Sequence, residues 1–174
     1  MTAQAEPSTS SLPQGQVSAS PSVYWPGVLA GLFGAALLAF WFFYLDFSRG
    51  EPLYTPTVLG TALFRGGAAL TSPETLSASI PLTLMFTVVH GLVFILIGVA
   101  GVRLLSLIER GPSLALGILL LFAVLGLGFF GFAITFSAVA LDALQMQDVL
   151  IGNAIAATGM AVYLLRHYQS RKAS

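Results

Sequence analysis

The sequence predicts an all-α integral membrane protein: a four-helix transmembrane bundle with a short interfacial helix in the first outer loop. Of the 174 residues, 56% are hydrophobic and 8% are charged, whereas soluble domains carry roughly 25% charged residues. The apolar residues are gathered into four long runs without a charged side chain, and about 20 such residues cross a bilayer as a helix. None of the runs shows the alternation of apolar and polar residues that a transmembrane β-barrel requires.

The four runs define the predicted spans. They cover residues 23–45, 80–102, 113–141 and 149–165. Trp25 and Trp41 lie near the two ends of the first run, as is typical of aromatic residues at membrane interfaces. The third run is longer than a bilayer needs, so its helix is expected to tilt or to end near Ser137. Residues 23–166 therefore form one predicted transmembrane domain.

The remaining segments and the charges predict the orientation. Residues 1–22 are rich in Ser, Ala, Gln and Pro and predict a disordered tail, and residues 167–174 form a short basic tail. Most of the Lys and Arg residues lie on the side shared by both termini and the second loop: Arg103, Arg110, Arg166, Arg171 and Lys172. Because positive residues accumulate on the inner side of membranes, we expect a cell-membrane protein with both termini in the cytoplasm.

The long outer loop, residues 46–79, contains the predicted interfacial helix. Thr55 followed by Pro56 is typical of a helix start, with Thr as the N-cap and Pro at the first helical position. The apolar residues that follow fall on one helical face: Val58, Leu59, Ala62, Leu63 and Phe64. Such a helix is expected at the outer membrane surface or over the mouth of the bundle. The next outer turn, 142–148, is short, which predicts that the spans beside it are antiparallel neighbours.

A row of small residues predicts close helix packing by the first span. Gly27, Gly31, Ala35 and Ala39 recur at every fourth position, so they share one helical face. Small residues allow the backbone of a second helix to approach closely inside a membrane. The partner is either another span of this chain, which we favour, or a span of another subunit.

The candidate site residues are one histidine and a set of polar side chains. His90 lies near the middle of the second span, and an ionisable residue at that depth indicates either a functional site or a hydrogen bond between helices. The polar set lies in the outer halves of the spans and comprises Thr83, Thr87, Thr135, Ser137, Asp142 and Asn153. Because buried polar groups need partners, we expect these residues to face one another, as a packing network or around a small outward-facing cavity.

The sequence points to no catalytic residues, metal site or specific cofactor. It lacks cysteine, a phosphate-binding loop, a Ser-His-Asp set and clustered carboxylates within a span. Haem at His90 is disfavoured because no second axial ligand at the same depth is evident, and His167 lies about half a membrane away. The zero net charge disfavours nucleic acid as a partner. The expected partners are the lipid bilayer and, beyond it, other membrane-protein subunits or a second copy.

Three function classes remain, in this order. The first is a non-enzymatic accessory, assembly or interaction subunit of a larger membrane complex, suggested by the small-residue faces and the scarcity of polar side chains. The second is a binding protein for a quinone, haem or lipid that uses His90 and the polar set. The third is a small transporter or channel, which is weaker because no span carries a charge and no internal repeat is visible.

Overall fold

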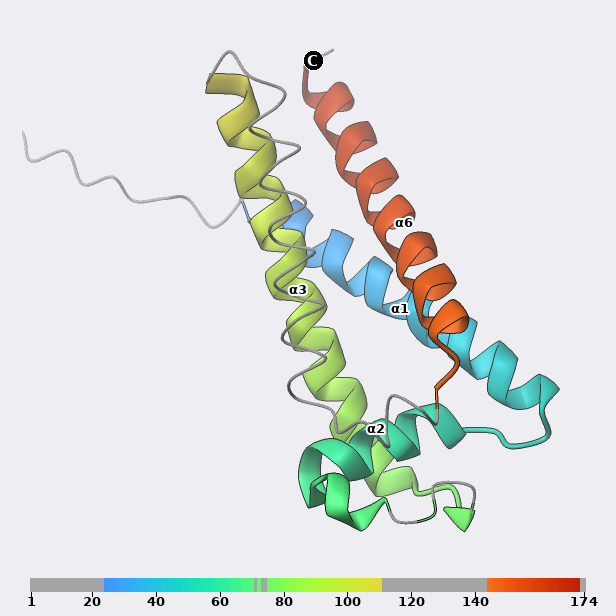
Figure 1. The fold of residues 1–174 in the computed structure, drawn as a ribbon. Helices are drawn as coiled ribbons and strands as arrows, with labels where there is room; N and C mark the ends of the chain where they lie inside the picture. The colour runs from blue at the N-terminus through green and yellow to red at the C-terminus, as the bar shows by residue number, and fades with distance from the viewer. Residues whose placement is uncertain (1–23, 71, 73–74, 111–143, 173–174) are drawn as a thin grey trace, which may run out of the picture.

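The computed structural model describes residues 24–70, 72, 75–110 and 144–172, and these residues are helical wherever they are regular. They form α1 (Trp25–Ser48), α2 (Tyr54–Arg65), the 3₁₀ turn η2 (Gly67–Ala69), α3 (Ile80–Arg110) and α6 (Met146–Lys172) (Figure 1). The all-α prediction is confirmed for this part of the chain, in which no strand occurs. The predicted tail at 1–22 and the predicted span at 113–141 lie outside the described residues.

Three helices are long and apolar enough to cross a membrane, namely α1, α3 and α6. They coincide with three predicted spans, but α3 and α6 continue well beyond their apolar parts, to Arg110 and Lys172. Arg, Lys, Gln and Glu are good helix formers, so hydropathy marks the end of an apolar segment and not the end of its helix. For the same reason α6 begins earlier than predicted, and Asp148 lies in its first turn and not in the preceding loop.

The predicted short helix exists as α2, but its start differs from the prediction. Leu53 turns the chain with a φ of 71°, which is unusual for a residue with a branched side chain. The helix then begins at Tyr54, so Thr55 lies within the first turn and is not the N-cap, and Pro56 is not the first helical residue. The Thr-Pro pattern therefore located the helix start to within two residues and assigned the wrong cap.

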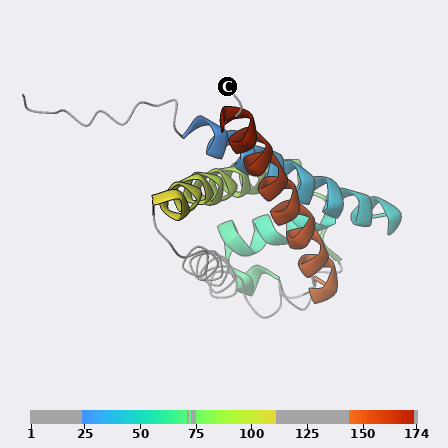
Figure 2. The same cartoon turned by 90° about the horizontal axis from the view of Figure 1, so that it is seen from above.

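The helices are arranged around α1, which packs against both α3 and α6 (Figures 1 and 2). α3 and α6 run in the same direction, and α1 crosses them in the opposite direction at an inclination. α2 packs on α3, beside the start of α3 and the start of α6. We refer to this end of the molecule as the α2 end.

Glycines allow the backbones of α1 and α3 to touch. A Cβ added to Gly27 would lie 2.8 Å from the carbonyl oxygen of Gly98, and one on Gly31 would meet the carbonyl oxygen of Phe94. Two members of the predicted small-residue row thus contact another helix of the same chain. The next member, Ala35, is buried, whereas Ala39 is exposed because α1 diverges from α3 toward the α2 end.

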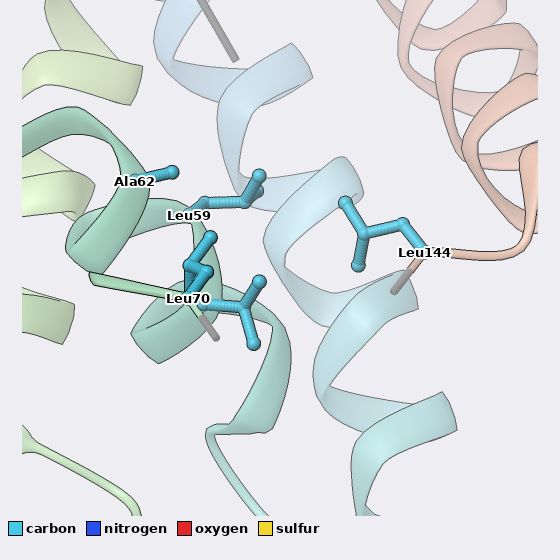
Figure 3. Packing of buried hydrophobic residues seen from close by; sticks show 5 residues of the cluster. Leu59, Ala62, Leu70 and Leu144 are labelled. Carbon is cyan, nitrogen blue, oxygen red and sulfur yellow. The ribbon is translucent and has the colours of Figure 1, made fainter. Parts of the chain in front are cut away.

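A cluster of buried apolar residues lies at the α2 end. It consists of Val58, Leu59, Ala62, Leu70 and Leu144, which come from α2 and the segments that follow η2 and precede α6 (Figure 3). The apolar face of α2 is thus turned into the molecule, except for Phe64, which is 40% exposed. This packing holds α2 against the ends of the long helices and positions the polar contacts described next.

Candidate functional site

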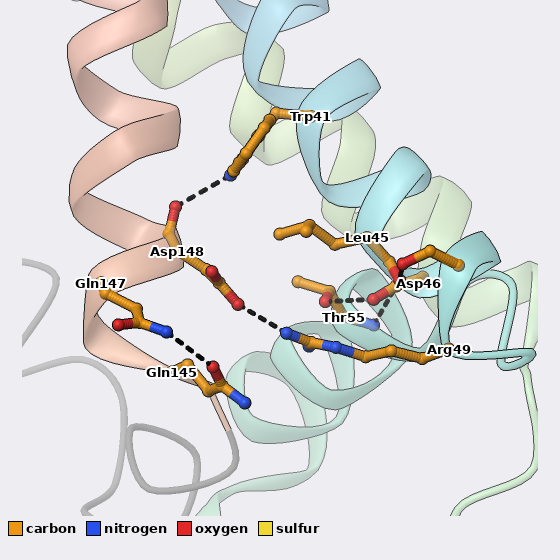
Figure 4. Close-up of polar contacts among 9 residues, drawn as sticks. Trp41, Leu45, Asp46, Arg49, Thr55, Gln145, Gln147 and Asp148 are labelled. Atoms are coloured by element: carbon orange, nitrogen blue, oxygen red, sulfur yellow. Dashed lines mark hydrogen bonds and ion pairs between the residues drawn. The ribbon is translucent and has the colours of Figure 1, made fainter.

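The α2 end contains a buried carboxylate that joins α1 to α2. Asp46 lies in the last turn of α1 and is 1% exposed. Its Oδ2 atom accepts the backbone N–H of Thr55 at 2.8 Å, and its Oδ1 atom accepts the Thr55 hydroxyl at 2.7 Å (Figure 4). The first N–H groups of a helix have no partner within it, and a negative charge is favourable there. Asp46 therefore caps α2 from the neighbouring helix.

A second polar contact joins α1 to α6 at the same end. The Arg49 guanidinium pairs with the Asp148 carboxylate, with Nη2 and Oδ2 2.6 Å apart. The indole Nε1 of Trp41 donates to the backbone carbonyl of Asp148 at 2.9 Å (Figure 4). Asp148 is 8% exposed, whereas the Arg49 side chain is 40% exposed, so only the carboxylate side of this pair is shielded from solvent. The start of α6 is thus fixed to α1 through both the side chain and the backbone of one residue.

Hydroxyl groups join α2 to the start of α3. The Thr57 side chain is 1% exposed. Its hydroxyl accepts the backbone N–H of Ser79 at 3.1 Å and lies 3.4 Å from the hydroxyl of Thr83. A Cβ on Gly60 would lie 2.7 Å from the carbonyl oxygen of Leu82, so the two backbones are nearly in contact. Close approach and hydroxyl bonding together dock α2 on α3.

The predicted polar set is only partly brought together. Thr83 contacts Thr57, but Thr87 and Asn153 are exposed and bond to carbonyl groups one turn back on their own helices, Thr83 and Val149. Thr135, Ser137 and Asp142 lie outside the described residues. The polar contacts that do form rely on Asp46, Arg49, Thr55, Thr57 and Asp148. The sequence placed Asp46, Arg49 and Asp148 in the outer loops and Thr55 at the cap of the short helix, and none of these residues lies inside a predicted span.

His90 lies between two aromatic rings and bonds to α1. Its ring centre is 5.7 Å from that of Phe86 and 4.7 Å from that of Phe94. Its Nε2 atom lies 3.4 Å from the carbonyl oxygen of Ala35, and because a carbonyl can only accept, Nε2 is the donor in this contact. This leaves Nδ1 as the acceptor of the ring. Among the described residues, no three His, Asp or Glu side chains lie close enough to hold a metal ion.

The opposite end of the bundle carries a different arrangement of charged and aromatic groups. The guanidinium carbon of Arg103 lies 4.6 Å from the ring centre of Tyr24, which joins α3 to the start of α1. The ring of His167 stacks on Tyr163, with centres 6.4 Å apart and an interplanar angle of 10°. Its Nε2 atom is buried and has no hydrogen-bond partner among the described residues.

Comparison with known proteins gives no match, whether by family model, by curated sequence or by solved structure.

Proposed function

We propose that the protein is a multi-pass integral membrane protein that acts as an accessory or assembly subunit by docking sideways on a larger membrane complex. Membrane placement is supported by large apolar side chains that are exposed on every long helix. Phe40 on α1 is 73% exposed, Leu84 on α3 is 60% exposed and Leu150 on α6 is 57% exposed. In water each exposed side chain of this size forgoes about 1.5–3 kcal/mol of burial free energy, whereas lipid solvates it.

The observation that carries the docking proposal is a row of small residues on the exposed side of α6. Asn153, Ala157 and Ala161 recur at four-residue spacing and are all exposed. The Asn153 Nδ2 group donates to the Val149 carbonyl, and its Oδ1 atom has no hydrogen-bond partner among the described residues. Lipid tails cannot hydrogen-bond this amide, but a second helix that approaches over the small residues can.

The arrangement of contacts favours an interaction role over catalysis. Gly27 and Gly31 of α1 are engaged by α3 within the chain and Ala35 is buried, so this part of the row is not available to a partner. The buried polar groups at the α2 end bond to one another and hold the helices in place. The exposed row of α6 is therefore the surface that we assign to a partner helix. The rival class, a cofactor or quinone binder, would use His90, whose Nε2 is engaged by Ala35.

The test is purification of the full chain from its native membrane in mild detergent, with two variants of α6. Ala157→Phe adds bulk within the row and is expected to abolish recovery of a stoichiometric protein partner. Val162→Phe is the matched control, because Val162 is 44% exposed and lies about 140° around the helix from Ala157. Purification of the wild-type chain alone, or equal partner recovery with both variants, contradicts the proposal. A co-purifying chromophore with no protein partner favours the binder class instead.

A further inference from the structure

The side of α3 that faces α1 is covered along only one half of the helix. At Gly98 the two backbones touch, since a Cβ there would lie 2.7 Å from the nitrogen of Gly31. Gly91 and Thr87 lie further toward the α2 end, each within about 20° of the direction of Gly98 around the helix. A Cβ on Gly91 would meet no described atom within 4 Å, and Thr87 is exposed. Because α1 diverges from α3 here (Figure 1), the described helices leave Thr87 and Gly91 open, and we call them the uncovered stretch of α3.

His90 borders the uncovered stretch and carries an acceptor nitrogen. The side chain is half-buried, and its Nε2 atom donates to the carbonyl of Ala35. In its neutral form the ring has one N–H, so the Nδ1 atom keeps a lone pair and accepts. No described residue donates to Nδ1. The buried side-chain nitrogen that lacks a partner in the described part of the chain belongs to His167, so Nδ1 of His90 is not enclosed.

Thr87 adds a second acceptor on the same surface of the helix. Residues three apart are neighbours on a helix, which places Thr87 beside His90. The Thr87 hydroxyl donates its only proton to the carbonyl oxygen of Thr83 at 2.7 Å, so its oxygen is left to accept. Lipid tails have no hydroxyl or amide group that could donate to either atom. The two residues therefore select a membrane-soluble ligand that carries a hydrogen-bond donor.

The surroundings of His90 favour a ligand with an aromatic ring. The rings of Phe86 and Phe94 lie on either side of the imidazole, with centres 5.7 and 4.7 Å from its own. Gly91 has no side chain and leaves space next to these rings for a flat group. Leu84, which is 60% exposed, lies further along the same side of α3 and offers apolar contact. Aromatic rings attract one another beyond the effect of burial, so a ring that bears a hydroxyl group fits both the acceptors and the rings.

We propose that the uncovered stretch of α3, together with His90, binds the ring of a membrane quinol, the reduced form of a lipid-soluble quinone. A quinol hydroxyl donates to Nδ1 of His90, and the Thr87 oxygen is the second acceptor beside it. A quinone has only carbonyl oxygens, which accept, and it finds no donor here because the N–H of His90 is engaged by Ala35. The proposal concerns binding and includes no electron transfer. It rests on the membrane placement that the proposed function assumes, and it does not depend on the small-residue row of α6.

The experiment titrates the purified full chain, in neutral detergent and without oxygen, with decylubiquinol, decylubiquinone and dioctanoylglycerol. Isothermal titration calorimetry gives the dissociation constants. Decylubiquinol is expected to bind, and decylubiquinone is expected to bind about tenfold more weakly because it lacks the donor. Equal affinity for the quinol and the quinone would overturn the proposal. Equal affinity for dioctanoylglycerol, whose hydroxyl is aliphatic, would show that the site does not select a ring and would overturn the quinol assignment.

Three variants of α3 test the position of the site. Gly91→Phe fills the uncovered stretch and is expected to fold, because a Cβ there meets no described atom within 4 Å, but to bind the quinol at least about tenfold more weakly. His90→Phe keeps a ring between Phe86 and Phe94 but removes both nitrogens, and it should weaken binding by a similar factor. Leu96→Phe is the matched control, because Leu96 is 69% exposed and lies about 140° around α3 from Gly91. Unchanged affinity in Gly91→Phe, or equal losses in Gly91→Phe and Leu96→Phe, would overturn the site.

The quinol site and the docking surface can fail separately. Ala157→Phe, which disrupts the small-residue row of α6, is expected to bind decylubiquinol as the wild-type chain does. Loss of quinol binding in Ala157→Phe, with binding retained in Gly91→Phe, would place the ligand on α6 and overturn the site on α3. Failure of the chain to insert into phosphatidylcholine vesicles would overturn the membrane placement on which both proposals rest.

Discussion

Asp46 shows how one buried side chain can set the path of the chain between two helices. The turn from Arg49 to Leu53 reverses the chain so that the start of α2 returns to the last turn of α1, where the carboxylate accepts both donors of Thr55. Removal of an acceptor at this position leaves the Thr55 N–H buried without a partner. A buried donor without a partner costs about 1–3 kcal/mol.

This predicts losses of different size for two substitutions of Asp46. Asp46→Asn keeps an oxygen for the Thr55 N–H and turns an amide donor toward the Thr55 hydroxyl, which can accept, so we expect a loss below about 1 kcal/mol. Asp46→Leu removes both acceptors and should reduce the free energy of unfolding by about 2–3 kcal/mol. Equilibrium unfolding of the purified variants in detergent measures both values. Equal losses in the two variants would show that charge, and not hydrogen bonding, is what the position requires.

Two substitutions of His90, near the middle of the bundle, are expected to differ in the same way. If the contact of Nε2 with the Ala35 carbonyl is structural, His90→Gln should retain most of the stability because a glutamine amide also donates. His90→Leu should cost on the order of 0.6–2 kcal/mol, as found for hydrogen bonds between membrane helices. The measurement is unfolding in detergent together with the absorption spectrum of the purified chain. Loss of a bound chromophore in a stable His90→Gln variant would instead assign His90 to a ligand.

The contact of α1 with α3 depends on backbone approach at three glycines. A Cβ on Gly98 would meet the carbonyl oxygen of Gly27 and lie 2.7 Å from the nitrogen of Gly31. All of these atoms are backbone, so neither helix can relieve the clash by a side-chain rotation. The small-residue row of α1 is visible in the sequence, whereas the glycines of α3, Gly91, Gly98 and Gly101, do not recur at four-residue spacing. This is why the sequence indicated the packing face but not the partner.

Two glycines of α3 therefore provide a matched test. Gly98→Ala should destabilise the bundle by about 1–3 kcal/mol, the usual range for inserting a methyl group into a packed interface. Gly91→Ala should be neutral or slightly stabilising, since a Cβ there would meet no atom within 4 Å and alanine is the better helix former. Thermal unfolding of both variants in the same detergent compares them. Similar unfolding temperatures for the two would contradict the close approach of α1 and α3.

At the level of the whole molecule, the hydropathy of the sequence located the helices that need long apolar runs. It did not locate the contacts that form only after the helices have packed together. It located α1, α3 and α6 because each needs a long run of apolar residues, and it located α2 from its apolar face. It could not find the pairing of Arg49 with Asp148, because the two residues are 99 positions apart and meet only after α6 has packed on α1. It also could not show that two members of the polar set, Thr87 and Asn153, bond to carbonyl groups of their own helices.

The orientation of the molecule is a prediction that the charge distribution makes and a labelling experiment can decide. The chain has no cysteine, so a single introduced thiol reports one position without background. Ser72, which is exposed and follows η2, should react with a membrane-impermeant thiol reagent in intact cells when replaced by cysteine. Ser10→Cys should react only after the cells are opened, because the predicted cytoplasmic side carries most of the Lys and Arg residues. Labelling of both positions from the outside would contradict the single span, 23–45, that is predicted between them, and with it the four-span topology. Labelling of Ser10 alone would invert the orientation, and the basic end with Arg103 would then face the outer leaflet.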